Sequence, residues 1–227
     1  MIIGIIPARK GSKRIKNKNT KLLNGKPLVE YTIIEAKKSK LLDKILISTD
    51  CPIIKKISKI NGINIPKLRS KKLSSANIEM LPVLKDALII NNLKKKAKII
   101  VLLQPTSPLR KAEHIDGAIK IFNQKKADTL VSVCYTNKIP SVSKIMIENN
   151  GYLRLFNKNK DKYIKGRKYL IRNGPAIFIT KASLILKNKL YGKKIIPFKM
   201  QNKFSVDINY HKDFYYAEKL IKKYEWF

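Results

Sequence analysis

The chain has few acidic residues, few cysteines and no long apolar run, and each shortage excludes a class of protein. Only 15 of its 227 residues are Asp or Glu, against 50 Lys or Arg. Cys51 and Cys134 are its only cysteines and have no metal-type spacing, so we expect reduced thiols. No stretch approaches the roughly 18 apolar residues of a membrane span, and the N-terminal apolar run precedes its basic run, the reverse of a secretory signal. We therefore expect a cytoplasmic protein with no membrane partner.

The formal net charge of +35 has two explanations. A strongly basic chain can bind nucleic acid. Alternatively, Lys, Ile and Asn are abundant while Arg, Ala and Gly are scarce, which is the bias expected of AT-rich codons. We favour compositional drift and do not expect nucleic acid as the partner, although the charge should attract anionic ligands.

Short apolar runs alternate with helix-like segments along most of the chain. Strands are expected at 2–6, 44–48, 97–103, 128–133 and 176–180, and helices at about 27–39, 52–60, 79–92, 111–124 and from 212 to the end. This alternation predicts an α/β fold with a mostly parallel central sheet and helices on both faces. The length and the hydrophobic fraction of 44% fit one domain spanning residues 1–227.

Residues of about 138–172 break the alternation. Asn150 and Gly151 form a turn signal between alternating segments, which predicts β-hairpins. We interpret this stretch as an arm that projects from the sheet and serves dimerisation.

The first expected strand runs into a strongly basic loop, "ARKGSKRIKNKN". Gly11 and Ser12 can bring backbone N–H groups close to a phosphate, and charge comes from Arg9, Lys13, Arg14, Lys16, Lys18 and Lys21. The loop has neither the Walker spacing nor the GxGxxG spacing. By charge alone, a triphosphate clamp and a solvated basic loop are equally good interpretations.

Three further polar segments follow expected strands, and the carboxyl ends of such strands carry the ligand sites of open α/β sheets. They are "LLQPTSPLR" (102–110), "RNGPAIFI" (172–179) and "SVDIN" (205–209). Gln104 can read a base or a sugar hydroxyl, or bond to the end of its strand. Alternation places Asp207 and Asn209 on one face, where they could hold Mg²⁺, or lie on an exposed face or cap the last helix.

Five motifs in order carry a resemblance over nearly the whole chain: "IIPARKGSKRIKNKN…NGKPLVEYTI", "STD", "LLQPTSPLR", "RNGPAIFI" and "SVDIN…DF…AE". Together they resemble the acylneuraminate cytidylyltransferase family, the CMP-sialic acid synthetases and their relatives for other nonulosonic acids. The resemblance implies a Rossmann-like transferase of cell-surface glycan biosynthesis that joins CTP to an acidic nine-carbon sugar, a 3-deoxy-2-ulosonic acid, and releases pyrophosphate. It also implies Mg²⁺ as cofactor and a homodimer formed through a projecting arm.

The resemblance also implies roles for individual residues. CTP would be bound by Arg9, Gly11, Ser12, Lys13, Lys18, Asn19 and Arg69. The sugar would be bound by Gln104, Thr106, Arg167 and Asn173, with Lys144 as a weaker candidate. Asp207 and Asn209 would hold the metal, and the expected catalytic residues are Arg9, Lys13, Lys18 and Asp207. The expected reaction is in-line attack by the anomeric 2-hydroxyl of the sugar on the α-phosphorus of CTP.

This chain departs from the family pattern at two places. The family's D-I-D is "DIN" here, so the second ligand is a neutral amide that should hold Mg²⁺ more weakly. Asp213 could compensate, but we favour it as a cap of the last helix. The acidic stretch "ELASD" of relatives is replaced by "KKLSSAN", with Ala76 where an aspartate is usual. Two alternatives stay open: a 3-deoxy-manno-octulosonate cytidylyltransferase, and a catalytically impaired homologue that binds nucleotide or nucleic acid.

Overall fold

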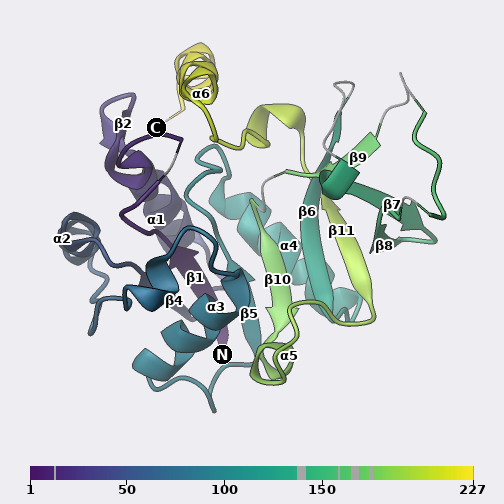
Figure 1. The fold of residues 1–227 in the computed structure, drawn as a ribbon, viewed down its shortest axis with the longest axis horizontal. Helices are drawn as coiled ribbons and strands as arrows, with labels where there is room; N and C mark the ends of the chain where they lie inside the picture. Colours follow the sequence, from purple (N-terminus) through teal and green to yellow (C-terminus); the bar gives the residue numbers. More distant parts are fainter. Residues whose placement is uncertain (13, 137–141, 158, 165–168, 174–175, 227) are drawn as a thin grey trace.

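The computed structural model describes residues 1–12, 14–136, 142–157, 159–164, 169–173 and 176–226. Within these residues a nine-stranded sheet forms the centre of the molecule, in the order β4-β1-β5-β10-β6-β9-β7-β8 with β11 also paired to β6 (Figure 1). Its strands are β1 (Ile2–Pro7), β4 (Lys44–Ser48), β5 (Ile99–Leu102), β6 (Thr129–Thr136), β7 (Ile145–Asn149), β8 (Tyr152–Leu155), β9 (Tyr169–Arg172), β10 (Phe178–Lys181) and β11 (Ile195–Lys199). Two short strands, β2 (Leu22–Leu23) and β3 (Lys26–Pro27), form a separate pair.

The first half of the sheet is parallel, as the alternation of strands and helices predicts. β1 pairs in parallel with both β4 and β5. β10 then lies antiparallel between β5 and β6, whereas β11 pairs with β6 in parallel. The sheet is therefore Rossmann-like in its first half and mixed as a whole.

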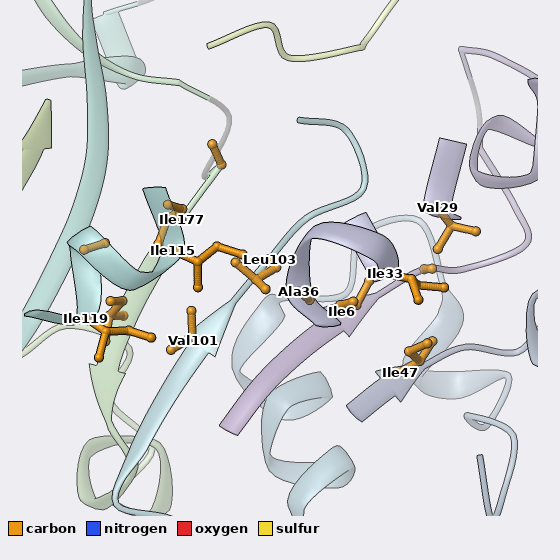
Figure 2. Close-up of a cluster of buried hydrophobic side chains, with 14 of the residues drawn as sticks. Ile6, Val29, Ile33, Ala36, Ile47, Val101, Leu103, Ile115, Ile119 and Ile177 are labelled. Carbon is orange, nitrogen blue, oxygen red and sulfur yellow. The ribbon is translucent and has the colours of Figure 1, made fainter. Parts of the chain in front are cut away.

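Helices cover both faces of the sheet, as expected. They are α1 (Leu28–Lys38), α2 (Pro52–Ile60), α3 (Met80–Ile90), α4 (Ala112–Gln124), α5 (Ala182–Leu186) and α6 (His211–Lys223). On one face, Ile33 of α1 lies over β1 and β4, and Ile115 and Ile119 of α4 lie over β5 and β10 (Figure 2). On the other face, Leu84 and Leu88 of α3 pack with Ile185 of α5 against the same strands.

The segment that breaks the alternation does form a hairpin. β7 and β8 pair antiparallel across Asn150 and Gly151, which both have positive φ (49° and 78°), the pattern of a type I′ turn. β7 also pairs with β9, and β9 with β6, so these strands extend the central sheet at one edge (Figure 1). Residues 137–141, 158 and 165–168 of the segment lie outside the described residues, and its role in dimerisation stays a prediction.

The ends of three neighbouring strands bring the polar loops to one edge of the sheet. The N–H of Ala8, after β1, donates to the carbonyl of Ser48 in β4 (2.9 Å), and the N–H of Leu103, after β5, donates to the carbonyl of Ile5 (3.0 Å). α6 closes this edge, because its apolar side chains Phe214 and Ile221 pack with Ile15 of the opening loop. No helix in the described ranges has the length and apolar character needed to cross a membrane.

Candidate active site

Two adjoining cavities open at the carboxyl ends of β1, β4 and β5. The first, of about 210 Å³, lies between the opening loop, Arg69 and the edge that follows β5. The second, of about 360 Å³, is lined by Arg14, Lys18, Gln104, Thr106, Lys144, Arg172, Asp207 and Asn209. Lys18, Gln104 and Thr106 line both cavities, so ligands bound in the two would meet at these three side chains.

Most of the residues expected to bind CTP line the first cavity. They are Arg9, Gly11, Ser12, Lys18, Asn19 and Arg69, whereas Lys13 lies outside the described residues. Asn19 closes the opening loop, since its Nδ2 donates to the carbonyl of Arg9 (2.9 Å). A Cβ on Gly11 would meet no atom within 4 Å, so the space above this backbone is open to a ligand. The loop therefore combines exposed backbone with cationic side chains at the end of a strand, as a phosphate site requires.

Arg69 is 6% exposed and is fixed at the wall of the first cavity. Its N–H donates to the carbonyl of Thr49 (2.7 Å) and its Nε donates to Ser74 Oγ (3.2 Å). Burial lowers the pKa of its guanidinium, and the nearby carboxylate of Asp50 works in the opposite direction. Within the "STD" motif, Thr49 therefore holds the backbone of this arginine, and Asp50 acts on the guanidinium through its charge.

The edge between the two cavities is built from the segment that follows β5. Thr106 accepts a hydrogen bond at its carbonyl from the N–H of Ile208 (2.8 Å), which joins this segment to the one that carries Asp207. Thr106 Oγ1 is buried and has no hydrogen-bond partner among the described residues. A buried hydroxyl without a partner is costly, so a small rotation that exposed this hydroxyl to a ligand in either cavity would be favoured.

The second cavity combines four cationic side chains with one carboxylate. Lys144 Nζ lies 3.4 Å from Asp207 Oδ2. Lys18 Nζ donates to the carbonyl of Ile208 (2.8 Å), and burial lowers the pKa of this lysine despite the opposing effect of Asp207. A cavity with this excess of positive charge suits an anionic ligand.

Arg172 is a cavity residue that the sequence did not single out as a site residue. Its Nη2 donates to the carbonyl of Ser143 (2.7 Å) and its Nη1 donates to the hydroxyl of Tyr191 (3.3 Å). Its Nε is buried without a partner in the described part of the chain. The sequence feature that could have identified Arg172 is its position at the end of an apolar run, directly before Asn173. Arg167, the arginine expected from the resemblance, lies outside the described residues.

Asn173 is placed differently from the other expected sugar contacts. It is 3% exposed and lines neither of the two cavities. Its side chain bonds instead to Ser132 and Ser205. Direct contact of Asn173 with a sugar therefore stays a prediction, whereas Gln104 and Thr106 do line the cavities.

Asp207 and Asn209 lie side by side in the second cavity, although the segment that carries them is not a strand. Asn209 Nδ2 donates to Asp207 Oδ2 (2.7 Å), and Asn209 Oδ1 accepts a hydrogen bond from Arg14 Nη1 (3.2 Å). Asp213 Oδ2 accepts from the N–H groups of Asn209 and Tyr210 (2.8 Å each), so it caps α6 as expected. No cluster of three His, Cys, Asp or Glu occurs in the described ranges. A divalent cation at Asp207 would therefore need further oxygen ligands from a substrate phosphate.

Comparison with known proteins agrees with this arrangement. Residues 3–225, which include both cavities, match the family model described as cytidylyltransferase. A CMP-N,N'-diacetyllegionaminic acid synthase of Legionella pneumophila is 34% identical over 227 residues, covering 97% of this chain and 96% of that protein. An N-acylneuraminate cytidylyltransferase of Escherichia coli is 33% identical over 98% of this chain, which spans 52% of that longer protein.

The fold has close matches among solved structures. A CMP:2-keto-3-deoxy-manno-octonic acid synthetase complexed with CTP superposes with a TM-score of 0.74 over 98% of this chain and 99% of that chain. The two are 13% identical, so this likeness establishes the fold alone. The family match over almost the whole chain, and relatives above 30% identity, go further and confirm the family to which the five motifs pointed. This chain belongs to the cytidylyltransferase family.

Proposed function

We propose that this protein transfers a cytidylyl group from CTP to a sialic-acid-like nonulosonic acid, giving the CMP-sugar and pyrophosphate. The observation that carries the proposal is the pair of adjoining cavities, one beside the basic opening loop and one with four cations around Asp207, which meet at Lys18, Gln104 and Thr106. Relatives named for diacetyllegionaminic acid and for N-acylneuraminate support this substrate class.

CTP would lie in the first cavity with its phosphates over the opening loop. Backbone N–H groups at Gly11 and Ser12 and the side chain of Arg9 would contact the phosphates. Lys18, at the junction of the cavities, would offset the negative charge that builds on the departing pyrophosphate. Transfer of this kind depends on positioning and charge neutralisation, so no protein nucleophile is needed.

The sugar would lie in the second cavity. Its carboxylate would bind the guanidinium of Arg172 in the cavity wall, with Lys144 as a second cation. Gln104 and Thr106 would contact both substrates and so align the 2-hydroxyl of the sugar with the α-phosphorus.

The donor set fits Mg²⁺ held jointly with substrate, since Mg²⁺ is commonly bound by one or two carboxylates together with phosphate oxygens. Asp207 would be the protein ligand, and Asn209 would join it only if its amide oxygen turned away from Arg14. When bound, the ion would neutralise phosphate charge. Lys18 and Arg14 supply fixed positive charge at the same place.

We also propose that the protein pairs with a second copy through the edge formed by β7, β8 and β9. β8 is the last strand of the sheet, and Tyr152 and Leu155 on it are 45% and 50% exposed. Although β8 lies beside β11, with Lys194 Nζ 5.7 Å from the centre of the Tyr152 ring, no strand among the described residues is hydrogen-bonded to its outer edge, and such an edge with exposed apolar side chains favours association. Light scattering during size-exclusion chromatography would measure the mass, and a mass near 26.1 kDa would contradict pairing.

The function is tested by incubating the protein with CTP, MgCl₂ and one acidic sugar at a time, and measuring pyrophosphate and CMP-sugar. The panel holds N-acetylneuraminic, N,N'-diacetyllegionaminic and pseudaminic acids, with 3-deoxy-manno-octulosonate as the competing substrate. We expect product with at least one nine-carbon acid and little with the octulosonate.

The variant Asp207→Asn serves as the inactive control, because Asp207 carries the one carboxylate that the described residues contribute to the second cavity. Pyrophosphate release with the octulosonate alone would instead favour the alternative sugar. No release with any sugar, combined with salt-sensitive binding of RNA, would favour the catalytically impaired homologue.

A further inference from the structure

A chain of side-chain hydrogen bonds runs behind the second cavity, from β6 to the segment that carries Asp207. The N–H of Ile177 donates to Ser132 Oγ (2.8 Å), and the Ser132 hydroxyl donates to Asn173 Oδ1 (2.7 Å). Asn173 Nδ2 then donates to Ser205 Oγ (3.0 Å), and the Ser205 hydroxyl donates to the carbonyl of Gln201 (2.9 Å). Within these four bonds each hydroxyl accepts once and donates once, so their directions are mutually consistent. Ser205 is also a hydrogen-bond partner of the Cys134 thiol in β6.

The centre of this chain is the buried amide of Asn173. Both ends of the amide are in use, Oδ1 by Ser132 and Nδ2 by Ser205, with Met200 Sδ a further 3.5 Å contact of Nδ2. Burying an amide costs desolvation free energy unless the amide is hydrogen-bonded, and these bonds offset that desolvation. To contact a sugar, Asn173 would have to leave at least one of them.

The hydrogen-bond chain reaches the Asp207 segment at Ser205. Ser205 lies two residues before Asp207, in a stretch without regular secondary structure. On the other side of Asp207, the N–H of Ile208 donates to the carbonyl of Thr106 (2.8 Å), and the carbonyl of Ile208 accepts from Lys18 Nζ (2.8 Å). Asp207 therefore lies between two anchors, and the anchor on its N-terminal side is Ser205.

We propose that Asn173 is a positioning residue that fixes the Asp207 carboxylate through Ser205, and that it does not contact the sugar. The expected fall in kcat rests on the proposed function, in which Asp207 holds an Mg²⁺ ion together with the CTP phosphates. The effect on mobility does not rest on that function, because a change at Asn173 or at Ser205 removes the same hydrogen bond between β6 and the Asp207 segment.

The experiment compares Asn173→Ala, Ser205→Ala and the double variant. Each single variant is expected to speed amide hydrogen exchange across residues 205–209 and to lower kcat about tenfold, the equivalent of one buried hydrogen bond. The KM for the sugar is expected to stay near the wild-type value. The double variant should be no worse than the worse single variant, because both changes break the bond between Asn173 and Ser205 and only Ser205→Ala also removes the bonds of Ser205 to Gln201 and Cys134.

Two control variants separate this role from a general loss of stability. Ser205→Thr keeps a hydroxyl at the same position and should restore wild-type exchange and kcat. Ser58→Ala removes another buried serine hydroxyl, which donates to the carbonyl of Ile54 in α2 (2.7 Å), and should leave both readouts unchanged. If Asn173→Ala does not fold, the pair Ser205→Ala and Ser205→Thr carries the test.

The proposal is overturned if Asn173→Ala raises the sugar KM while Ser205→Ala does not, because that pattern is a direct sugar contact. Additive losses in the double variant, or wild-type exchange across 205–209 in both singles, would overturn it as well. Failure of the wild-type protein to make any CMP-sugar would be a different result. It would remove the proposed function but leave the exchange measurement as a test of the link.

Discussion

Asn209 changes the electrostatics of the second cavity at the scale of a single residue. Its amide donates to the carboxylate of Asp207 and accepts from Arg14, so it connects an anion to a cation. A second carboxylate at this position would repel Asp207 in the absence of a bound cation. The asparagine therefore holds the Asp207 carboxylate in place without a metal ion. A metal ion at this site would in turn have one negatively charged ligand fewer.

We predict that Asn209→Asp raises the affinity of the nucleotide-free protein for Mn²⁺ at least about tenfold, because a second carboxylate adds electrostatic attraction for a divalent ion. Isothermal titration calorimetry with Mn²⁺ and no CTP would measure it. Asn64→Asp is the matched control, since it makes the same charge change at an exposed position that lines neither of these two cavities. Equal isotherms for wild type and Asn209→Asp would show that residue 209 is not a ligand even as a carboxylate.

Arg110 is the last residue of "QPTSPLR", and the sequence alone assigned it no role. It is fully buried, and burial lowers the pKa of its guanidinium to about 9. Its Nη1 donates to the carbonyl of Ala176 (2.7 Å) and to that of Gln104 (3.3 Å). One side chain thus ties the edge between the cavities to the segment that follows Asn173.

At the scale of elements, the start of α6 is tied to the active-site segment. Asp213, in the first turn of α6, bonds to the N–H of Asn209 as well as to that of Tyr210. A carboxylate here satisfies N–H groups at the start of the helix and also favours the positive end of its dipole. The same group therefore stabilises the helix and limits the movement of Asn209.

We predict that Asp213→Ala lowers the free energy of unfolding by about 1 kcal/mol, the usual value of a helix cap, with a fall in Tm of roughly 2–4 °C. Urea denaturation followed by circular dichroism would measure the change. Glu218→Ala is the comparison within the same helix, because the Glu218 carboxylate forms an exposed i,i+4 ion pair with Lys222 (3.7 Å) and does not cap the helix. A loss for Asp213→Ala no larger than that for Glu218→Ala would contradict the capping role.

At the scale of the whole molecule, the net charge of +35 acts on every anionic ligand that approaches. The cationic side chains of the opening loop and the second cavity lie within this larger positive field. Screening by salt weakens the long-range part of the attraction, because the Debye length falls from about 10 Å at 0.1 M to about 3 Å at 1 M. Affinity for CTP should therefore depend on ionic strength whether or not the charge arose by compositional drift.

We predict that the Kd for CTP rises several-fold, roughly three- to tenfold, between 50 and 300 mM NaCl, because salt screens the charges that attract the triphosphate. Cytidine is the matched control, since it carries the same base and sugar with no phosphate, and its Kd should change little. Calorimetry at three salt concentrations would give both values. A parallel salt dependence for the two ligands would contradict an electrostatic contribution from the phosphates.

Local sequence determined the elements of this protein. The apolar runs at 2–6 and 44–48 became β1 and β4 because both are covered by helices on the two faces of the sheet, β1 between two strands and β4 at the edge. The Asn150–Gly151 turn formed its hairpin because these residues accept positive φ. The motif order also predicted the family and the cavity-lining roles of Arg9, Lys18 and Gln104, since a polar residue just after a parallel strand lies at the ligand-binding edge.

Only the tertiary structure decided which distant residues share a cavity. Arg14, Arg172 and Asp207 lie far apart in the chain, and they meet because β1, β9 and the segment before α6 end at the same edge of one sheet. The hydrogen bonds of the Asn173 amide to Ser132 and Ser205 are likewise visible only in the tertiary structure, whereas its expected contact with the sugar stays a prediction. Sequence patterns determine the local backbone hydrogen bonds of helices and turns. The direction of a buried side chain depends instead on partners that are distant in the sequence and that only the complete fold brings into contact.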